Sequence, residues 1–200
     1  MEQQETLLAP TNTYLKSGIH IGTKFKTKYM ERFIYKTRPD GLSVLNLQQI
    51  DERIRAAARL LAQYAPEDIL VASRRENGWK PIKVFQKHTG VKVVTGRYPP
   101  GMMTNTNLVT FIEPKILFVN DAWPDRNAVM DANKIGIPVI ALCDTNNHPN
   151  FIDLVVPCNN KGKKALGLIF YLLTVEYLRL RGTLAPEQEL GASIDDFTEK

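Results

Sequence analysis

Apolar residues gather into five short runs along the chain, at residues 69–72, 91–94, 116–119, 139–142 and 154–156. These runs show little alternation between apolar and polar positions, and turn-forming or helix-forming segments separate them. Short runs of this kind are typical of strands that are buried on both faces of a parallel sheet. The pattern therefore predicts five strands in a covered sheet.

Helical spacing of apolar residues fills most of the intervals. One face of an amphipathic helix is predicted by residues separated by four, three, four and three positions: Ile50, Ile54, Ala57, Leu61 and Tyr64. Pro66 ends this helix. Further helices are predicted over residues 81–88, 124–135 and 161–181, with a shorter one inside 101–112. Strands that alternate with helices favour a doubly wound α/β fold. We expect a flavodoxin-like, parallel five-stranded sheet with helices on both faces.

The N-terminal part of the chain has a different pattern. Residues 32–36 and 42–47 flank the turn-forming sequence Arg38-Pro39-Asp40-Gly41, which predicts a β-hairpin. We expect three parts: a basic arm over 1–31 that begins with a loose segment or short helix, an α/β domain over 32–185 with the hairpin 32–47 packed on it, and an acidic tail over 186–200.

Positive charge is concentrated in the arm and hairpin. Residues 16–38 contain seven Lys or Arg and one acidic residue, Glu31, whereas the whole chain has a net charge of +5. Without the acidic tail the formal charge is +9. A basic body of this kind favours an anionic polymer as partner. Phe25, Tyr29 and Phe33 lie at a spacing of four, which would place them on one side of a helix facing the core. We therefore favour phosphate contacts by the cations over base stacking by the aromatic rings.

Three further basic groups follow predicted strands or begin a predicted helix. They are Arg74-Arg75, Arg97-Tyr98 and Lys161-Gly162-Lys163-Lys164. Positive side chains at a helix start oppose the helix dipole, which an arriving phosphate or acidic surface would relieve. Simple solvation of these side chains is an equal alternative. Trp79 and Trp123 lie in strand-to-helix connections, where we expect them to anchor packing.

No catalytic motif accompanies the predicted fold. The chain lacks a Gly-x-Gly-x-x-Gly loop, a phosphate-binding loop with Walker spacing and a Gly-x-Ser-x-Gly elbow, and its three histidines lie far apart. We expect no catalytic residue, cofactor or metal site. Asp121 and Asp144 follow strands, where catalytic carboxylates would lie, but helix capping or turn formation is favoured for both.

The two cysteines, Cys143 and Cys158, are expected to be reduced thiols in a cytosolic protein. The N-terminus does not have the pattern of a secretory signal. The longest apolar stretch, residues 165–178, is too short to cross a bilayer. We therefore expect no association with a membrane.

Several sequence segments together resemble one family. They are Gly18-Ile19-His20-Ile21-Gly22-Thr23, Phe33-Ile34-Tyr35 with Leu45-Asn46-Leu47, Gly101-Met102-Met103-Thr104-Asn105, the segment 114–119, and the segment 136–146 with its Gly-Ile-Pro-Val and Asp-Thr-Asn sequences. The chain resembles the small-subunit ribosomal protein two family from about Tyr14 to Gly182. The bacterial helical-hairpin insertion is absent before residue 114, and the long eukaryotic C-terminal extension is absent after Lys200. This favours the archaeal type.

The resemblance implies a structural constituent of the small (30S) ribosomal subunit in the cytoplasm, without enzymatic activity or cofactor. It implies small-subunit rRNA and neighbouring ribosomal proteins as partners, and we do not expect homo-oligomers. The expected RNA-binding residues are Lys16, His20, Lys24, Lys26, Lys28, Arg32, Lys36, Arg38, Arg74, Arg75, Arg97, Lys161, Lys163 and Lys164. We also consider that the tail residues Leu190, Ile194 and Phe197 dock on a basic neighbour.

Two other functions stay open from the residues alone. One is a flavodoxin-like enzyme that binds a nucleotide at the strand ends, with Asp121 or Asp144 as the catalytic group. The other is a basic adaptor that binds acidic proteins without RNA.

Overall fold

A computed structural model describes residues 7–185, 188 and 190–198. Its main sheet has five parallel strands in the order β4-β3-β5-β6-β7, which is the flavodoxin-like order expected from the sequence. The strands are β3 (Ile69–Ser73), β4 (Lys92–Thr95), β5 (Ile116–Val119), β6 (Val139–Cys143) and β7 (Leu154–Pro157). The predicted hairpin is also confirmed, as an antiparallel pair formed by β1 (Ile34–Thr37) and β2 (Ser43–Leu45).

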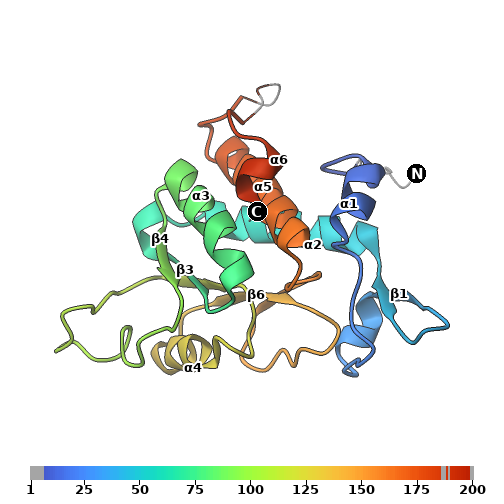
Figure 1. The fold of residues 1–200 in the computed structure, drawn as a ribbon. Coiled ribbons are helices and arrows are strands. Elements are labelled where there is room, and N and C mark those ends of the chain that lie inside the picture. The colour runs from blue at the N-terminus through green and yellow to red at the C-terminus, as the bar shows by residue number, and fades with distance from the viewer. Residues whose placement is uncertain (1–6, 186–187, 189, 199–200) are drawn as a thin grey trace.

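The helices cover the two faces of the sheet unequally. α2, α3 and α5 lie over one face, and α4 lies alone over the other (Figure 1). The helices are α1 (Thr11–Ser17), α2 (Leu47–Ala62), α3 (Trp79–Thr89), α4 (Arg126–Ile135), α5 (Lys163–Leu180) and α6 (Ile194–Phe197). Short 3-10 helices are η1 (Met30–Phe33), η2 (Pro66–Asp68) and η3 (Glu76–Gly78). The predicted helices therefore form, except the short one inside 101–112.

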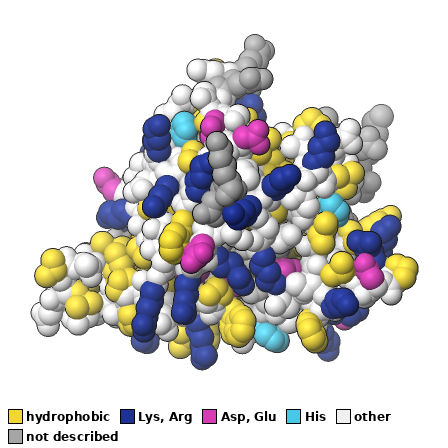
Figure 2. All heavy atoms as spheres, in the orientation of Figure 1, with side chains coloured by type: hydrophobic (Ala, Val, Ile, Leu, Met, Phe, Trp, Pro, Cys, Tyr) yellow, Lys and Arg dark blue, Asp and Glu magenta, His cyan; other side chains and the backbone are white. Residues whose placement is uncertain are grey.

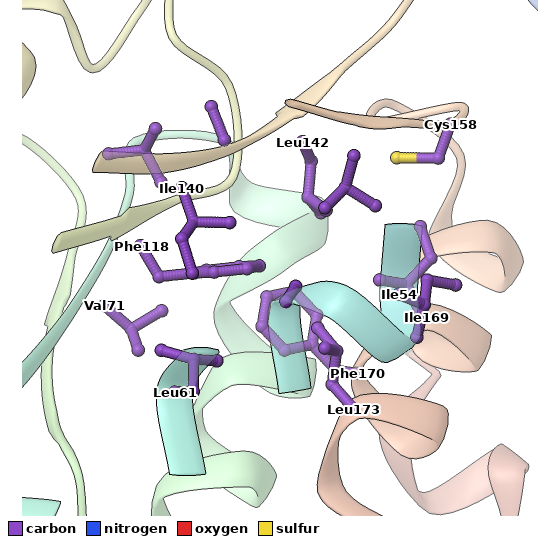
Figure 3. Packing of buried hydrophobic residues seen from close by; sticks show 14 of the residues in the cluster. Ile54, Leu61, Val71, Phe118, Ile140, Leu142, Cys158, Ile169, Phe170 and Leu173 are labelled. Carbon is purple, nitrogen blue, oxygen red and sulfur yellow. The ribbon is translucent and has the colours of Figure 1, made fainter. Parts of the chain in front are cut away.

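The core is formed where α5 packs against α2 and α3 over one face of the sheet. Phe170 of α5 faces Phe118 of β5, with ring centroids 5.7 Å apart, and Ile54 and Leu61 of α2 lie beside them (Figure 3). Phe85 of α3 completes the aromatic group at 5.9 Å from Phe170. A helix enclosed in this way is apolar around most of its circumference, which explains the long apolar stretch in its sequence.

The expectation of a short helix inside 101–112 is wrong. This part of the connection from β4 to β5 consists of turns. Pro99 and Pro100 precede it, and Gly101 has φ +87°, a left-handed conformation that interrupts a helix. The segment is instead held by α4, because Asp131 accepts hydrogen bonds from the Gly101 backbone nitrogen at 2.8 Å and the Tyr98 hydroxyl at 3.3 Å.

The described part of the acidic tail packs on its own chain. Phe197 is fully buried, and its ring lies 6.2 Å from that of His88 in α3 and 5.8 Å from that of Tyr171 in α5. Leu190 is also buried. A Cβ atom on Gly167 of α5 would lie 2.5 Å from Thr198 Oγ1, so the close approach of this segment requires glycine there. The idea that Leu190 and Phe197 dock on a neighbour is therefore wrong, because both are already buried.

Replacing Phe197 by Ala should lower the free energy of unfolding by about 3 kcal/mol, because a fully buried ring is lost. The same substitution at Phe25, which is 80% exposed, should change it by less than about 0.5 kcal/mol. Urea denaturation of both variants measures the difference. Equal effects would show that the tail does not pack on the body in solution.

Candidate nucleic-acid interface

The basic arm lies across the carboxyl edge of the sheet. Thr145, which follows β6, accepts a hydrogen bond from the Thr23 backbone nitrogen at 2.9 Å through its hydroxyl. Its carbonyl accepts another from the Thr27 backbone nitrogen at 2.9 Å, and the Thr27 hydroxyl donates to the Asn147 carbonyl. The Gly22 backbone nitrogen also donates to the Ser43 carbonyl of the hairpin. The arm is therefore held against the body from Gly22 to Thr27.

The expected helix with Phe25, Tyr29 and Phe33 on one inward face does not form. Only Met30–Phe33 is helical, as a 3-10 turn, because residues 22–27 take an extended course that pairs with Thr145. Phe33 is buried, Tyr29 lies at the surface beneath the Arg32 guanidinium at 3.7 Å, and Phe25 is 80% exposed. An exposed ring among lysines is therefore available for stacking, and of the three rings only Phe33 lies in the core as the helical spacing suggested.

The arm cations point to solvent. Lys24, Lys26, Lys28 and Arg32 are all exposed, and Lys26 forms only a surface ion pair with Glu31 at 3.3 Å. Such exposed pairs contribute little to stability. Figure 2 shows Lys and Arg side chains spread over this face of the molecule, including its lower edge. The three lysines can thus meet phosphates without loss of internal structure, whereas Arg32 also donates from Nε to the Tyr29 carbonyl at 3.1 Å.

The hairpin carries a second basic group. Lys36, Arg38 and His20 line a groove of about 570 Å³ together with Tyr35, which is 70% exposed. Arg38 lies 3.4 Å from Asp40 at the surface. Burial lowers the pKa of His20 below its usual value, so this side chain is neutral at pH 7. Lys16 is exposed on α1, and its neighbour Leu15 lines the groove.

Arg75 and Lys161 hold the body together instead of lying free. Arg75 donates to Oδ2 of the buried Asp121 at 2.6 Å, across the point between β3 and β5 where the strand order reverses. Lys161 donates to Oδ2 of the buried Asp144 at 2.8 Å. Asn147 connects the two pairs, since it donates to Asp121 and accepts from the Asp144 backbone nitrogen, both at 2.8 Å. The turn-forming role favoured for Asp121 and Asp144 is confirmed, and both also neutralise a cation.

The other predicted cations of the edge are exposed. Arg74 follows β3, Arg97 follows β4, and Lys163 and Lys164 begin α5. The N-cap of α5 is Gly162, so Lys161 precedes the helix and only Lys163 and Lys164 lie in its first turn. The structure therefore brings the three basic groups to one edge of the sheet, next to the arm.

A cavity of about 710 Å³ opens at the same edge, between α4 and the connection from β6 to β7. Trp123 and Phe151 line it and are 78% and 53% exposed. The expectation that Trp123 anchors packing is wrong, because Pro124 and Asp125 turn the chain and leave the ring outside. Trp79 is the anchor, since its indole nitrogen donates to the Ser73 carbonyl at 3.1 Å. Arg126 also lines the cavity; the only sequence signal for it was its position just after a strand-to-helix turn.

The buried thiols and carboxyls of this edge are not arranged for metal binding. Cys143 and Cys158 are buried and free, and burial raises the pKa of both thiols well above the ordinary value. Within residues 7–185, 188 and 190–198, no group of three His, Cys, Asp or Glu side chains is placed to hold a metal ion. The helices of this part of the chain are also too short or too polar to cross a membrane.

Replacing Arg75 by Ala should lower the free energy of unfolding by about 3 kcal/mol, because Asp121 would stay buried without its cation. The adjacent Arg74→Ala removes the same charge from an exposed position and should cost less than about 0.5 kcal/mol. Chemical denaturation compares the two variants. If Arg75→Ala were as stable as Arg74→Ala, the structural role of the Arg75 pair would be refuted.

Burial raises the pKa of Asp125 to about 7, whereas an unfolded Asp ionises near about pH 4. The folded chain therefore binds one more proton than the unfolded chain between these values, so this group makes the free energy of unfolding fall as pH rises from about 4 to 7. Asp125→Asn cannot ionise, and its unfolding free energy should decline less over that interval. Denaturation series at several pH values measure both slopes, and parallel curves would contradict the assignment.

Comparison with known proteins identifies the family of this chain. The family model described as ribosomal protein S2 matches residues 14–111 and 109–177. The chain is 45% identical to the small ribosomal subunit protein uS2 of Nanoarchaeum equitans over 193 residues, which cover 96% of each chain. It is 46% identical to that of Pyrobaculum calidifontis over 98% of this chain and 95% of the relative. The match to the Methanococcus maripaludis protein is 47% over 98% and 88%. The protein thus belongs to the ribosomal protein S2 family, in its archaeal type.

Proposed function

We propose that this protein is a structural constituent of the small ribosomal subunit in the cytoplasm, where it supports subunit assembly and translation. In this proposal the arm and the carboxyl edge of the sheet hold small-subunit rRNA. The proposed contact with RNA rests on one observation, which is the way the arm is held. Its four exposed cations, Lys24, Lys26, Lys28 and Arg32, are fixed by hydrogen bonds between the arm backbone and the 145–147 turn.

The physical basis is electrostatic. Lys and Arg side chains that reach phosphates release condensed counterions, which supplies affinity that falls with added salt. A fixed backbone lowers the ordering cost of that binding, because the arm does not have to be folded onto RNA first. The hydrogen bonds from Thr23 and Thr27 to Thr145 support such a preformed arm.

The cations then divide into two classes. Exposed side chains bind RNA in this proposal: Lys16, Lys24, Lys26, Lys28, Arg32, Lys36, Arg38, Arg74, Arg97, Lys163 and Lys164. Arg75 and Lys161 form ion pairs with Asp121 and Asp144. In this proposal they stabilise the carboxyl edge of the sheet and add to its positive electrostatic potential. His20 contributes a neutral polar group. Neighbouring ribosomal proteins are further partners, and we propose that the chain acts as a single copy.

We also propose that the protein has no enzymatic function. The carboxylate oxygens of Asp121 accept from Arg75, Asn147 and the Trp123 backbone nitrogen, and those of Asp144 accept from Lys161 and the Thr145 backbone nitrogen. A general base requires a lone pair directed at its substrate, and these two carboxylates direct theirs at the protein. This favours the RNA-binding role over the alternative of a nucleotide enzyme.

Replacing Lys24, Lys26 and Lys28 together by Ala should weaken binding to a small-subunit rRNA fragment and flatten its salt dependence. Each lost phosphate contact should reduce the slope of log K against log salt by about 0.7 to 0.9. Filter binding at several salt concentrations measures both quantities.

The matched control removes the same charge from the outer side of α3 and the amino end of β4, as Lys83→Ala, Lys87→Ala and Lys92→Ala together. These three side chains are also exposed but lie away from the carboxyl edge. The control should keep nearly the full salt slope. Equal losses in the two triple variants would mean that net charge, and not the arm, determines binding.

A further inference from the structure

The cavity at the carboxyl edge is lined by exposed aromatic rings and by cationic side chains. Trp123 comes from the start of the β5-to-α4 connection, and Phe151 comes from the β6-to-β7 connection. Both rings are more than half exposed, although a chain of this size has ample core to bury them. Phe151 has φ +62°, a backbone conformation that is costly for an aromatic residue. Phe151 thus combines an exposed ring with an unfavourable backbone conformation.

The fold explains why this cavity is open. A doubly wound sheet normally carries a helix in each crossover, but the connection from β6 to β7, residues 144–153, has none. α4 therefore has no neighbouring helix on that side of the sheet (Figure 1). The turn that replaces the helix is fixed from below by Asn147, which bonds to Asp121 and Asn160. The cavity walls are consequently rigid on the side of the sheet.

The cavity is lined by three cationic side chains, and only two of them form an ion pair with a carboxylate of the described residues. Arg75 and Lys161 reach it from the side of the sheet, but each is paired with a buried carboxylate. Arg126 at the start of α4 is exposed and makes no side-chain hydrogen bond or ion pair with the residues that the structure describes. The cavity thus offers an anion one guanidinium without an internal partner, beside two rings.

We propose that this cavity receives one unstacked nucleotide of an RNA strand, with the base against Trp123 and Phe151 and its phosphate on Arg126. The inference rests on the proposed rRNA-binding function and assigns it a specific pocket. Single-stranded RNA is recognised by stacking of splayed bases on aromatic rings combined with cation–phosphate contacts. The volume of about 710 Å³ lies within the range of about 300–1,000 Å³ that is usual for small-molecule sites. The side-chain amides of Asn146 and Asn150, which also line the cavity, suit the polar edge of a base.

An acidic peptide fits the same cavity less well. It would use Arg126, but it would give no reason for two exposed rings from separate connections to line one space. The cavity is also continuous with the arm, because the 145–147 turn that borders it bonds to Thr23 and Thr27. An RNA strand bound by the arm therefore reaches the cavity without leaving the protein surface.

The fluorescence of Trp123 tests this proposal, because stacking of a base on an exposed indole quenches its emission. The titrant is single-stranded hexauridylate at low salt, and Trp79→Phe isolates the signal of Trp123. We expect saturable quenching. Filter binding of the hexamer measures the affinity of the variants that lack Trp123, and we expect about tenfold weaker binding in Trp123→Ala. Trp123→Phe should retain most of the affinity, since it keeps a ring. Arg126→Ala should weaken binding and reduce the salt dependence, whereas Lys87→Ala, which removes an exposed charge from α3, should leave the amplitude of quenching unchanged.

Two further titrants and one parallel measurement separate the outcomes. Uridine monophosphate should quench only weakly; binding as tight as that of the hexamer would identify a free-nucleotide site and overturn the proposal. Quenching by hexaglutamate but not by hexauridylate would overturn it in favour of an acidic partner.

Binding of the wild-type chain to an rRNA fragment is followed in parallel. If that fragment binds with the usual salt dependence while Trp123 emission and the Trp123→Ala affinity stay unchanged, the cavity assignment fails and the RNA-binding function stands. If the fragment does not bind, the function itself fails.

Discussion

The buried carboxylates at the carboxyl edge of the sheet are the constraint on which the rest of the surface depends. Asp121 and Asp144 are almost without solvent contact, and a desolvated charge requires a partner. Each takes one cation, Arg75 or Lys161, and Asn147 ties the two pairs together. The turn that contains Asn147 also provides Thr145 for the arm. Internal ion pairing therefore determines where the arm lies and which cations remain for an external partner.

The uneven distribution of helices has a functional consequence. α2, α3 and α5 form the thick hydrophobic layer that stabilises the domain, and the tail helix α6 adds to it through Phe197. The other face has α4 and two connections without helices. One of these, residues 98–112, carries no charged side chain, whereas the edge near residues 144–151 is bordered by cations. We infer that the stable layer supports the fold, and that the thinner side is where the protein meets its partners.

The fold was predictable because its determinants are local. Unbroken apolar runs such as 139–142 and the regular spacing from Ile50 to Tyr64 indicate their elements directly. The turns at 101–112 were not predictable in this way, since their anchor is Asp131, a residue thirty positions away on α4. The same limit applies to the site. Exposed arm cations follow from composition, but pairing of Arg75 with Asp121 and exposure of Trp123 depend on how distant segments meet at the edge.

Hydrogen exchange tests the central claim, that RNA is held at the carboxyl edge by the arm, most directly. Exchange of the free chain is compared with that of the chain bound to an rRNA fragment. The account predicts added protection in residues 18–32 and 144–151, and unchanged exchange in α2 and on the outer side of α3. Protection concentrated on α2 and α3, with the arm exchanging as freely as before, would contradict it.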